Sequence, residues 1–167
     1  MTSAEGWDTA NSRFTDLSGN GRHGALTGGA VTVWSSTGNG AGRSMPYVEG
    51  TTSSRIAWGA SSIPSTFTVC SITRYSGATR RRILQCQSKN WLHGHESGNA
   101  GATHYHGFGN VLYSISPNTN WLVMCSRNIN TAGAASSIAN GAVTSTAAGG
   151  IGDCDLGINQ ITWGGNN

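Results

Sequence analysis

The apolar residues of this chain are grouped in short bursts, and turn-forming residues separate one burst from the next. The bursts do not recur with the period of about 3.6 residues that an amphipathic helix requires. Turn signals rich in glycine, asparagine and serine lie between them, at residues 18–21, 28–29, 38–40, 97–99 and 149–150. This pattern predicts an all-β fold, a two-sheet antiparallel β-sandwich (jelly roll) with very little helix.

The bursts also predict where the strands lie. Almost every residue at 66–75 is β-branched, aromatic or small, and residues 121–125 have the same character. We therefore expect both of these strands mid-sheet and covered on both faces. Residues 129–148 hold few large apolar residues, so we expect exposed hairpins there. The full set of expected strands is 14–17, 30–34, 44–48, 55–58, 66–75, 81–85, 91–95, 103–108, 121–128, 136–143 and 157–161.

Four cysteines lie far apart in the chain, at Cys70, Cys86, Cys125 and Cys154. No CxxC pair occurs, so nothing indicates a zinc ribbon. The even number allows disulfides in three connectivities, and small buried thiols are the alternative. Because Cys70 and Cys125 lie in the two most apolar strands, we expect both in the sheet interior, either as a cross-strand pair or as inert thiols.

The amino-acid composition limits which partners the surface can bind. Only 10% of the 167 residues are charged, against a usual fraction of roughly 25%. The net charge of +3 comes from nine arginines and Lys89, and apart from Arg80–Arg82 the arginines are scattered singly. A nucleic-acid partner needs a basic face, so none is expected. No apolar run reaches the roughly 18 residues of a membrane span. The size and the even spread of glycine predict one domain over residues 1–167.

Three segments together resemble the LamG-like, concanavalin A-like lectin/glucanase jelly-roll domains. They are Phe-Thr-Asp-Leu-Ser-Gly-Asn-Gly-Arg-His-Gly at 14–24, the strand at 67–75 with Arg-Ile-Leu at 82–84, and Asn-Trp-Leu-His-Gly-His at 90–95, which is followed by a hairpin and Tyr105. The segment at 90–95 resembles one branch of these domains. The sequence differs from that branch at Glu96, where an aromatic residue is more usual. The resemblance implies a non-catalytic module of an extracellular or cell-surface protein, used for adhesion, glycan contact or assembly into a larger surface or filamentous structure.

The aromatic and histidine residues are the candidates for ligand contact. Sugar rings pack their C–H faces on aromatic planes, and Trp91, Trp121, Trp163, Tyr47, Tyr105 and Tyr113 could supply such planes. The alternative is that Trp91 and Trp121 fill the core, since Trp is highly buried on average. A glycan or neighbouring copies of the same chain are the expected partners. The predicted ligand-binding residues are Trp91, His93, His95, Tyr105 and His106.

The sequence contains two candidate sets of metal ligands. The histidine pairs at 93/95 and 104/106 could bind zinc or copper together with Glu96 if a hairpin placed them on one face, but we expect them to be polar sheet residues with hydrogen-bonded neighbours. No cofactor is expected. Calcium, which domains of the resembled family often bind, is the alternative, with Asp16, Asp153 and Asp155 as candidate ligands. The alternative role for Asp16 is to cap its own turn.

Catalysis is not expected. Glycoside hydrolysis normally needs two facing carboxylates, whereas the seven acidic residues here are scattered and mostly at turns. The strand-borne Glu-x-Asp-x-x-Glu pattern of the glucanases that the chain resembles is missing. The alternative function is a glycan hydrolase or lyase of the concanavalin A-like fold, for which His104 and Tyr105 would be the candidate pair.

The end of the sequence predicts an incomplete sheet. Domains of the resembled kind finish with a further strand after the segment at 157–159, which runs beside the N-terminal strand, and only residues 160–167 remain here. An open edge pairs readily with another chain. We therefore expect the missing strand to come from residues beyond 1–167 or from a neighbouring subunit. A contact of the second kind that does not close would give a filament.

Overall fold

The computed structural model describes residues 6–106, 114–128, 136–147 and 149–159. Within these residues the fold is all-β, without a helix, and every strand pair is antiparallel. The largest sheet has eight strands in the order β1 (Trp7–Asp8), β2 (Arg13–Phe14), β3 (Gly24–Gly28), β6 (Arg55–Ala57), β14 (Leu156–Ile158), β8 (Leu84–Cys86), β9 (Trp91–Glu96) and β10 (Asn99–Tyr105).

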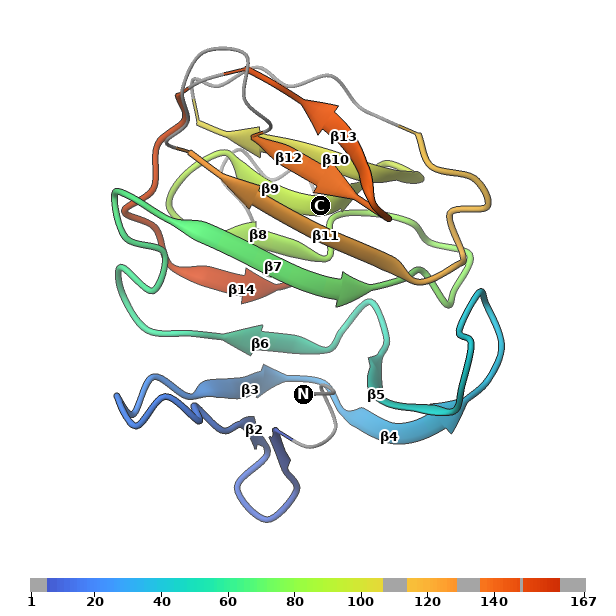
Figure 1. The fold of residues 1–167 in the computed structure, drawn as a ribbon. Helices are drawn as coiled ribbons and strands as arrows, with labels where there is room; N and C mark the ends of the chain where they lie inside the picture. Colours follow the sequence, from blue (N-terminus) through green and yellow to red (C-terminus); the bar gives the residue numbers. More distant parts are fainter. Residues whose placement is uncertain (1–5, 107–113, 129–135, 148, 160–167) are drawn as a thin grey trace.

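Two smaller sheets complete the structure. One has four strands in the order β13 (Ala142–Ser145), β12 (Ser137–Ala139), β11 (Leu122–Arg127) and β7 (Thr68–Thr73), and the other pairs β4 (Val31–Ser36) with β5 (Met45–Gly50). Figure 1 shows the four-stranded sheet in front of β8, β9 and β10, whereas β6 and β3 are seen beside it and not behind it. The predicted antiparallel β-sandwich is therefore confirmed, and its smaller layer covers one half of the larger sheet.

The main core lies between the two layers. Phe67 precedes β7, and its ring makes edge contacts with Trp91 of β9 and Tyr105 of β10 at centroid distances of 5.8 and 5.0 Å. Trp91 is 0% exposed and Tyr105 is 1% exposed. A neighbouring buried cluster joins Leu122 and Met124 of β11 to the large sheet. Complete burial of one large aromatic side chain stabilises the fold by about 1.5–3 kcal/mol.

The other half of the large sheet is less covered. Phe14 of β2 stacks on Trp58 at 6.0 Å, and the Trp58 ring fills the space where a Cβ of Gly24 would lie. Leu26 lies opposite Ile56, which lies opposite Ile158 in the next strand. Ile56 is buried, but the other large side chains of this row are only half-buried: Phe14, Leu26, Trp58 and Ile158.

Both disulfides are formed, and they differ in their surroundings. Cys70 and Cys125 are directly opposite each other in β7 and β11, as one of the two predicted alternatives requires. The prediction that they lie in the sheet interior is wrong, because Cys70 is exposed and Cys125 half-buried on the outer face. β7 shows the reason: its residues alternate between exposed and half-buried, and it is an edge strand with only one covered face.

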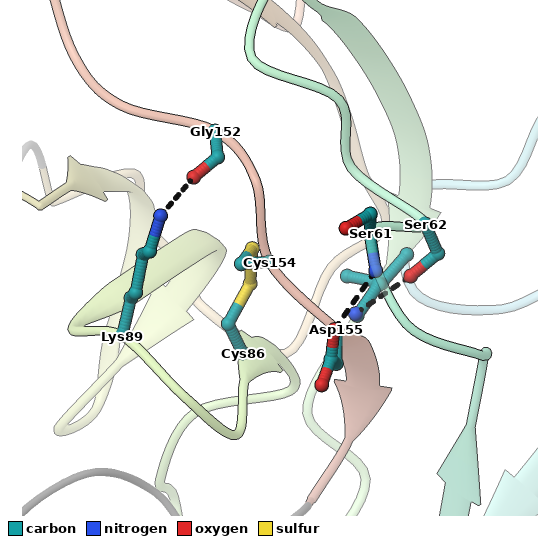
Figure 2. Close-up of a disulfide and its surroundings, with 8 residues drawn as sticks. Ser61, Ser62, Cys86, Lys89, Gly152, Cys154 and Asp155 are labelled. Carbon is teal, nitrogen blue, oxygen red and sulfur yellow. Dashed lines mark hydrogen bonds between the residues drawn. A yellow bond between two sulfur atoms is a disulfide. The ribbon is translucent and has the colours of Figure 1, made fainter.

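The second disulfide joins Cys86 to Cys154 in the core, where both residues are 0% exposed. Figure 2 shows how the surrounding segment is held. The Lys89 ammonium group donates to the Gly152 carbonyl at 3.0 Å, and the Ser61 amide donates to Asp155 Oδ1 at 2.9 Å. A Cβ at Gly152 would lie 1.8 Å from the Pro64 carbonyl oxygen, so only glycine fits there. These contacts fix the entry into β14.

Several strand boundaries differ from the sequence prediction. The expected strand at 136–143 is a hairpin, because Asn140 and Gly141 adopt φ values of 48° and 83° and turn the chain between β12 and β13. An Asn-Gly pair is a strong hairpin signal, and it places the turn inside the segment at 129–148 where hairpins are expected. The turn after Glu96 is also shorter than expected, since Asn99 pairs directly with Glu96. The strand at 24–28 was not predicted at all, and residues 160–161 of the last predicted strand lie outside the described residues.

Candidate functional site

The structure places most of the predicted ligand-binding residues inside the sandwich. Trp91, His93 and His95 are each 0% exposed and Tyr105 is 1% exposed, so a molecule outside the fold does not reach them. His106 is half-buried at the end of β10. The prediction of a ligand-contact surface is therefore corrected for the four buried residues. The reason is the alternation of side chains along β9 and β10, which places these four side chains on the face that packs against the four-stranded sheet.

The two buried histidines are neutral members of the core. His93 Nδ1 lies 3.0 Å from the Tyr105 hydroxyl, and His95 Nδ1 lies 3.2 Å from Thr73 Oγ1. Burial lowers the pKa of His93 to about 4. Burial, together with the nearby His93, also lowers the pKa of His95 to about 4. Burial raises the pKa of Tyr105 as well. The contacts agree with the interpretation of the two histidines as hydrogen-bonded sheet residues.

The register separates the two histidine pairs. Thr103 lies opposite His93 and His104 lies opposite Leu92, so His104 faces the other side of the sheet from His93. Glu96 forms an ion pair with Arg82 at 3.1 Å. The residues that the structure describes contain no group of three or more His, Cys, Asp or Glu side chains placed to hold a metal ion. The one-face arrangement that a four-histidine site would need is not formed.

The candidate calcium ligand Asp16 caps its own turn. Its Oδ1 accepts hydrogen bonds from the Ser18 amide and hydroxyl at 2.8 and 2.6 Å, and its Oδ2 accepts from the Arg22 amide at 2.9 Å. The bond from the Ser18 hydroxyl, followed by the two amide bonds, lowers the pKa of Asp16 to about 2. Asp155 accepts a hydrogen bond from Ser61, as Figure 2 shows, and Asp153 is exposed. That the chain has no cofactor, with calcium at these residues as the alternative, stays a prediction.

A depression on the outer side of the molecule is the best candidate for contact with another molecule. It has a volume of about 330 Å³ and lies where β5, β7 and β11 approach one another. The glycine-rich loop at 40–42, Met45, Ile72 and Val123 supply apolar walls, and Asn120, Trp121 and Asn140 complete the lining. The loop is held against the site by the Trp121 amide, which donates to the Asn39 carbonyl at 2.9 Å.

Aromatic rings and a cation lie beside this depression. The Trp121 ring makes an edge contact with Tyr47 at 5.3 Å, and the Arg74 guanidinium lies 5.3 Å from the Trp121 ring and 5.5 Å from the Tyr47 ring. Such cation–π contacts hold the arginine in place, with an energy of about 0.5–1 kcal/mol each at exposed sites. Trp121 is half-buried, so it does not fill the core as the alternative interpretation supposed.

Amide groups in the same lining can form hydrogen bonds with a ligand. Asn140 Oδ1 accepts from the Val123 amide at 2.8 Å, which leaves its NH₂ group without a partner among the described residues. The side-chain amide of Asn120 likewise has no partner in the part of the chain that the structure describes. The depression therefore combines an apolar floor with a few amide donors and acceptors, which is typical of a small-molecule site.

The sequence identified only part of this site. Tyr47 and Trp121 were among the six aromatic candidates, whereas the loop at 40–42, Met45 and the two asparagines were not singled out. The Gly-Asn-Gly signal at 38–40 predicted a turn, but nothing local showed that the turn would fold against Trp121. Of the other four aromatic candidates, Trp91 and Tyr105 are buried in the core, and Tyr113 and Trp163 lie outside the described residues.

The described residues contain no helix long and apolar enough to cross a membrane. We also compared the chain with protein-family models, with curated proteins and with solved structures. None of the three comparisons gave a match. The resemblance to LamG-like domains therefore remains a prediction from sequence motifs, and the candidate site rests on its own geometry.

Proposed function

We propose that the chain is a non-catalytic extracellular binding module that contacts a glycan in the depression beside Trp121. The observation that carries the proposal is the combination, in one depression, of a half-buried tryptophan with the side-chain amide of Asn120 and the NH₂ group of Asn140, which have no partner among the described residues. A sugar ring needs both features, an apolar plane for its C–H face and amides for its hydroxyl groups. Arg74, held against Tyr47 and Trp121, would favour an acidic sugar at the rim.

Two further features support an extracellular location. Both cysteine pairs form disulfides, and disulfides persist in oxidising compartments such as the cell exterior. The surface is also poor in charge, with 10% charged residues in the whole chain. Neither feature identifies the glycan, which has to come from experiment.

A glycan array tests this proposal. Wild-type protein should bind a subset of glycans, and Trp121→Ala should lose that binding while keeping its fold. Val143→Ala is the matched control, because Val143 is an exposed residue of the same sheet that does not line the depression. Binding that survives Trp121→Ala would contradict this site. Release of shorter sugars from a bound polysaccharide would instead favour the alternative function, a glycan-cleaving enzyme.

A second candidate function is assembly with other protein surfaces. Ile72, Val123, Ile138 and Val143 are 42–54% exposed on the outer face of the four-stranded sheet. The strand register places these residues close together, with Ile72 opposite Val123 and Ile138 opposite Val143. Contiguous apolar residues on a sheet face are typical of contact surfaces. Ile138→Ser should then reduce self-association, measured by light scattering at high concentration, without changing glycan binding.

A further inference from the structure

The direction of the backbone hydrogen bonds shows which groups of β7 are free. In β11, the Val123 carbonyl accepts from the Asn140 amide at 2.8 Å and the Arg127 amide donates to the Ser136 carbonyl at 2.9 Å, so the odd-numbered residues bond toward β12. The even-numbered residues bond toward β7, as the Asn128 amide does with the Phe67 carbonyl at 3.3 Å. Bonding in an antiparallel pair alternates along the strand.

The register between β11 and β7 shows which residues of β7 bond to β11. Ser71 lies opposite Met124 and Val69 lies opposite Ser126, so the odd-numbered residues of β7 bond to β11. The amide and carbonyl groups of Thr68, Cys70 and Ile72 therefore point away from β11, toward the free edge of the sheet. These groups have no hydrogen-bond partner among the residues that the structure describes.

The edge of β7 also lacks the features that usually protect a free strand. Thr-Val-Cys-Ser-Ile-Thr contains no charged residue and no proline, and its pairing with β11 is regular over all six residues. Edge strands normally carry lysine, proline or a bulge, which prevent pairing with another chain. An unprotected, regular and neutral edge favours addition of a strand.

The strand of the large sheet that is seen beside this edge carries apolar side chains. In Figure 1 the free edge of β7 points toward the region where β14 and β6 are seen. Leu156 and Ile158 of β14 are half-buried, and Leu156 packs against the core cluster that contains Phe67, the residue before β7. A strand added beside β7 would place alternate side chains toward the large sheet and the others toward solvent.

We propose that the free edge of β7 is a strand-addition site, which binds an extended segment of another polypeptide with apolar residues at alternate positions. The carbonyl and amide groups of Thr68, Cys70 and Ile72 would supply the backbone bonds, and the half-buried Leu156 and Ile158 of β14 would contact the apolar side chains. The occupant is an extended segment and not a second folded copy. The large sheet continues past β7, so the layers of a second sandwich would overlap with β6 and β14.

Hydrogen exchange of the single amides, followed by NMR, tests the proposal. In the isolated 167-residue chain the amides of Thr68, Cys70 and Ile72 should exchange quickly, while those of Val69, Ser71 and Thr73 should be protected. A short capped peptide that alternates valine and threonine is the probe. Saturating peptide should slow exchange at Cys70 and Ile72 by about tenfold or more, and the same peptide with N-methylated threonines should have no effect.

A matched pair of variants tests the role of the backbone. Thr68→Pro removes one edge amide without removing a bond to β11, and we expect it to weaken peptide binding about fivefold, as loss of one hydrogen bond does. Thr68→Val keeps the amide and the branched side chain and should bind like wild type. Thr68 does not line the depression beside Trp121, so glycan binding and peptide binding are tested separately.

Three outcomes would overturn the proposal. The edge is filled within the chain if the amides of Cys70 and Ile72 are already protected in dilute protein. The occupant is a second copy if this protection grows with protein concentration. The edge is not a binding site if neither amide responds to the peptide. The exchange measurement on wild type does not depend on whether Thr68→Pro folds.

Discussion

The two halves of the eight-stranded sheet have the same kind of pairing and different cover. Trp91 and Tyr105 in the half formed by β8, β9 and β10 are at most 1% exposed, because the four-stranded sheet packs on them. Phe14 and Trp58 in the half formed by β2, β3 and β6 stack on each other and remain half-buried. An aromatic residue in a strand therefore becomes a core residue only where a second layer lies over it.

The largest expected difference between the halves is in stability. Trp91→Ala should lower the free energy of unfolding by about 3–5 kcal/mol, because it leaves a cavity beside Phe67 and Tyr105. Trp58→Ala should lower it by only about 1–2 kcal/mol, since part of the ring already contacts water. Urea unfolding followed by circular dichroism measures both values. Equal losses of unfolding free energy would contradict this difference. They would mean that the half formed by β2, β3 and β6 is covered to the same degree as the other half.

The pH dependence of stability tests the polar residues in the covered half. The pKa values of His93 and His95 are lowered to about 4, against about 6.5 in an unfolded chain. The unfolded state therefore binds more protons, so stability is highest above pH 6.5 and falls as the pH decreases toward 4. Each pKa unit corresponds to about 1.4 kcal/mol, so the loss should reach a few kcal/mol.

Urea unfolding at several pH values measures this loss. His93→Gln or His95→Gln should reduce the slope of stability between pH 6.5 and 4, and the double variant should leave only the contribution of His104, whose pKa is also lowered by burial. His106→Gln, at the half-buried end of β10, is the control for removing a histidine. The Asp16 carboxylate has a pKa of about 2, so its contribution is lost only below about pH 4, outside this window. An unchanged slope in the double variant would contradict the burial of the two histidines.

The two disulfides should differ in their reaction with a thiol reductant. Cys70 is exposed on the outer face, whereas Cys86 and Cys154 are 0% exposed. Because thiol–disulfide exchange needs access to a sulfur atom, a mild thiol at neutral pH should reduce Cys70–Cys125 at least about tenfold faster. Alkylation at timed intervals and mass spectrometry identify the reacted cysteines. Reduction of both disulfides at the same rate would contradict this prediction. It would show that the reductant reaches the buried Cys86–Cys154 as readily as the exposed Cys70–Cys125.

The smallest expected effect is at the half-buried row itself. Leu26→Thr should change the free energy of unfolding by no more than about 1 kcal/mol, since Leu26 is only half-buried. It should nevertheless reduce the fluorescence of a dye that binds exposed apolar surface in the native protein. Ile138→Thr on the outer face of the four-stranded sheet is the matched control. If the control removes the signal and Leu26→Thr does not, the dye binds the outer face.

Much of the fold could be predicted from the sequence. The short apolar bursts and the glycine-rich turns determined an all-β sandwich, and most expected strands overlap a strand of the structure. The ends of strands were harder to predict where small residues occur both in a strand and in the turn that follows it. Hairpins are expected over residues 129–148, but the expected strand at 136–143 runs across the turn at Asn140–Gly141, because the small residues around it give little alternation.

The candidate site was harder to predict, because it depends on contacts between distant segments. Trp121, Tyr47 and Arg74 are far apart in the sequence and meet only because β5, β7 and β11 converge. The depression also needs the loop at 40–42, and no local signal shows which element that loop will contact.

Strands and turns follow from the sequence alone, because backbone preference and alternation are local properties. The covered side of each strand depends on the tertiary structure. His93, Trp91 and Tyr105 have the composition of a sugar-binding surface, yet they are buried, and Cys70 has the neighbours of a core residue, yet it is exposed. The physical reason is that burial depends on where the second layer lies, and a strand carries no local record of that layer's position.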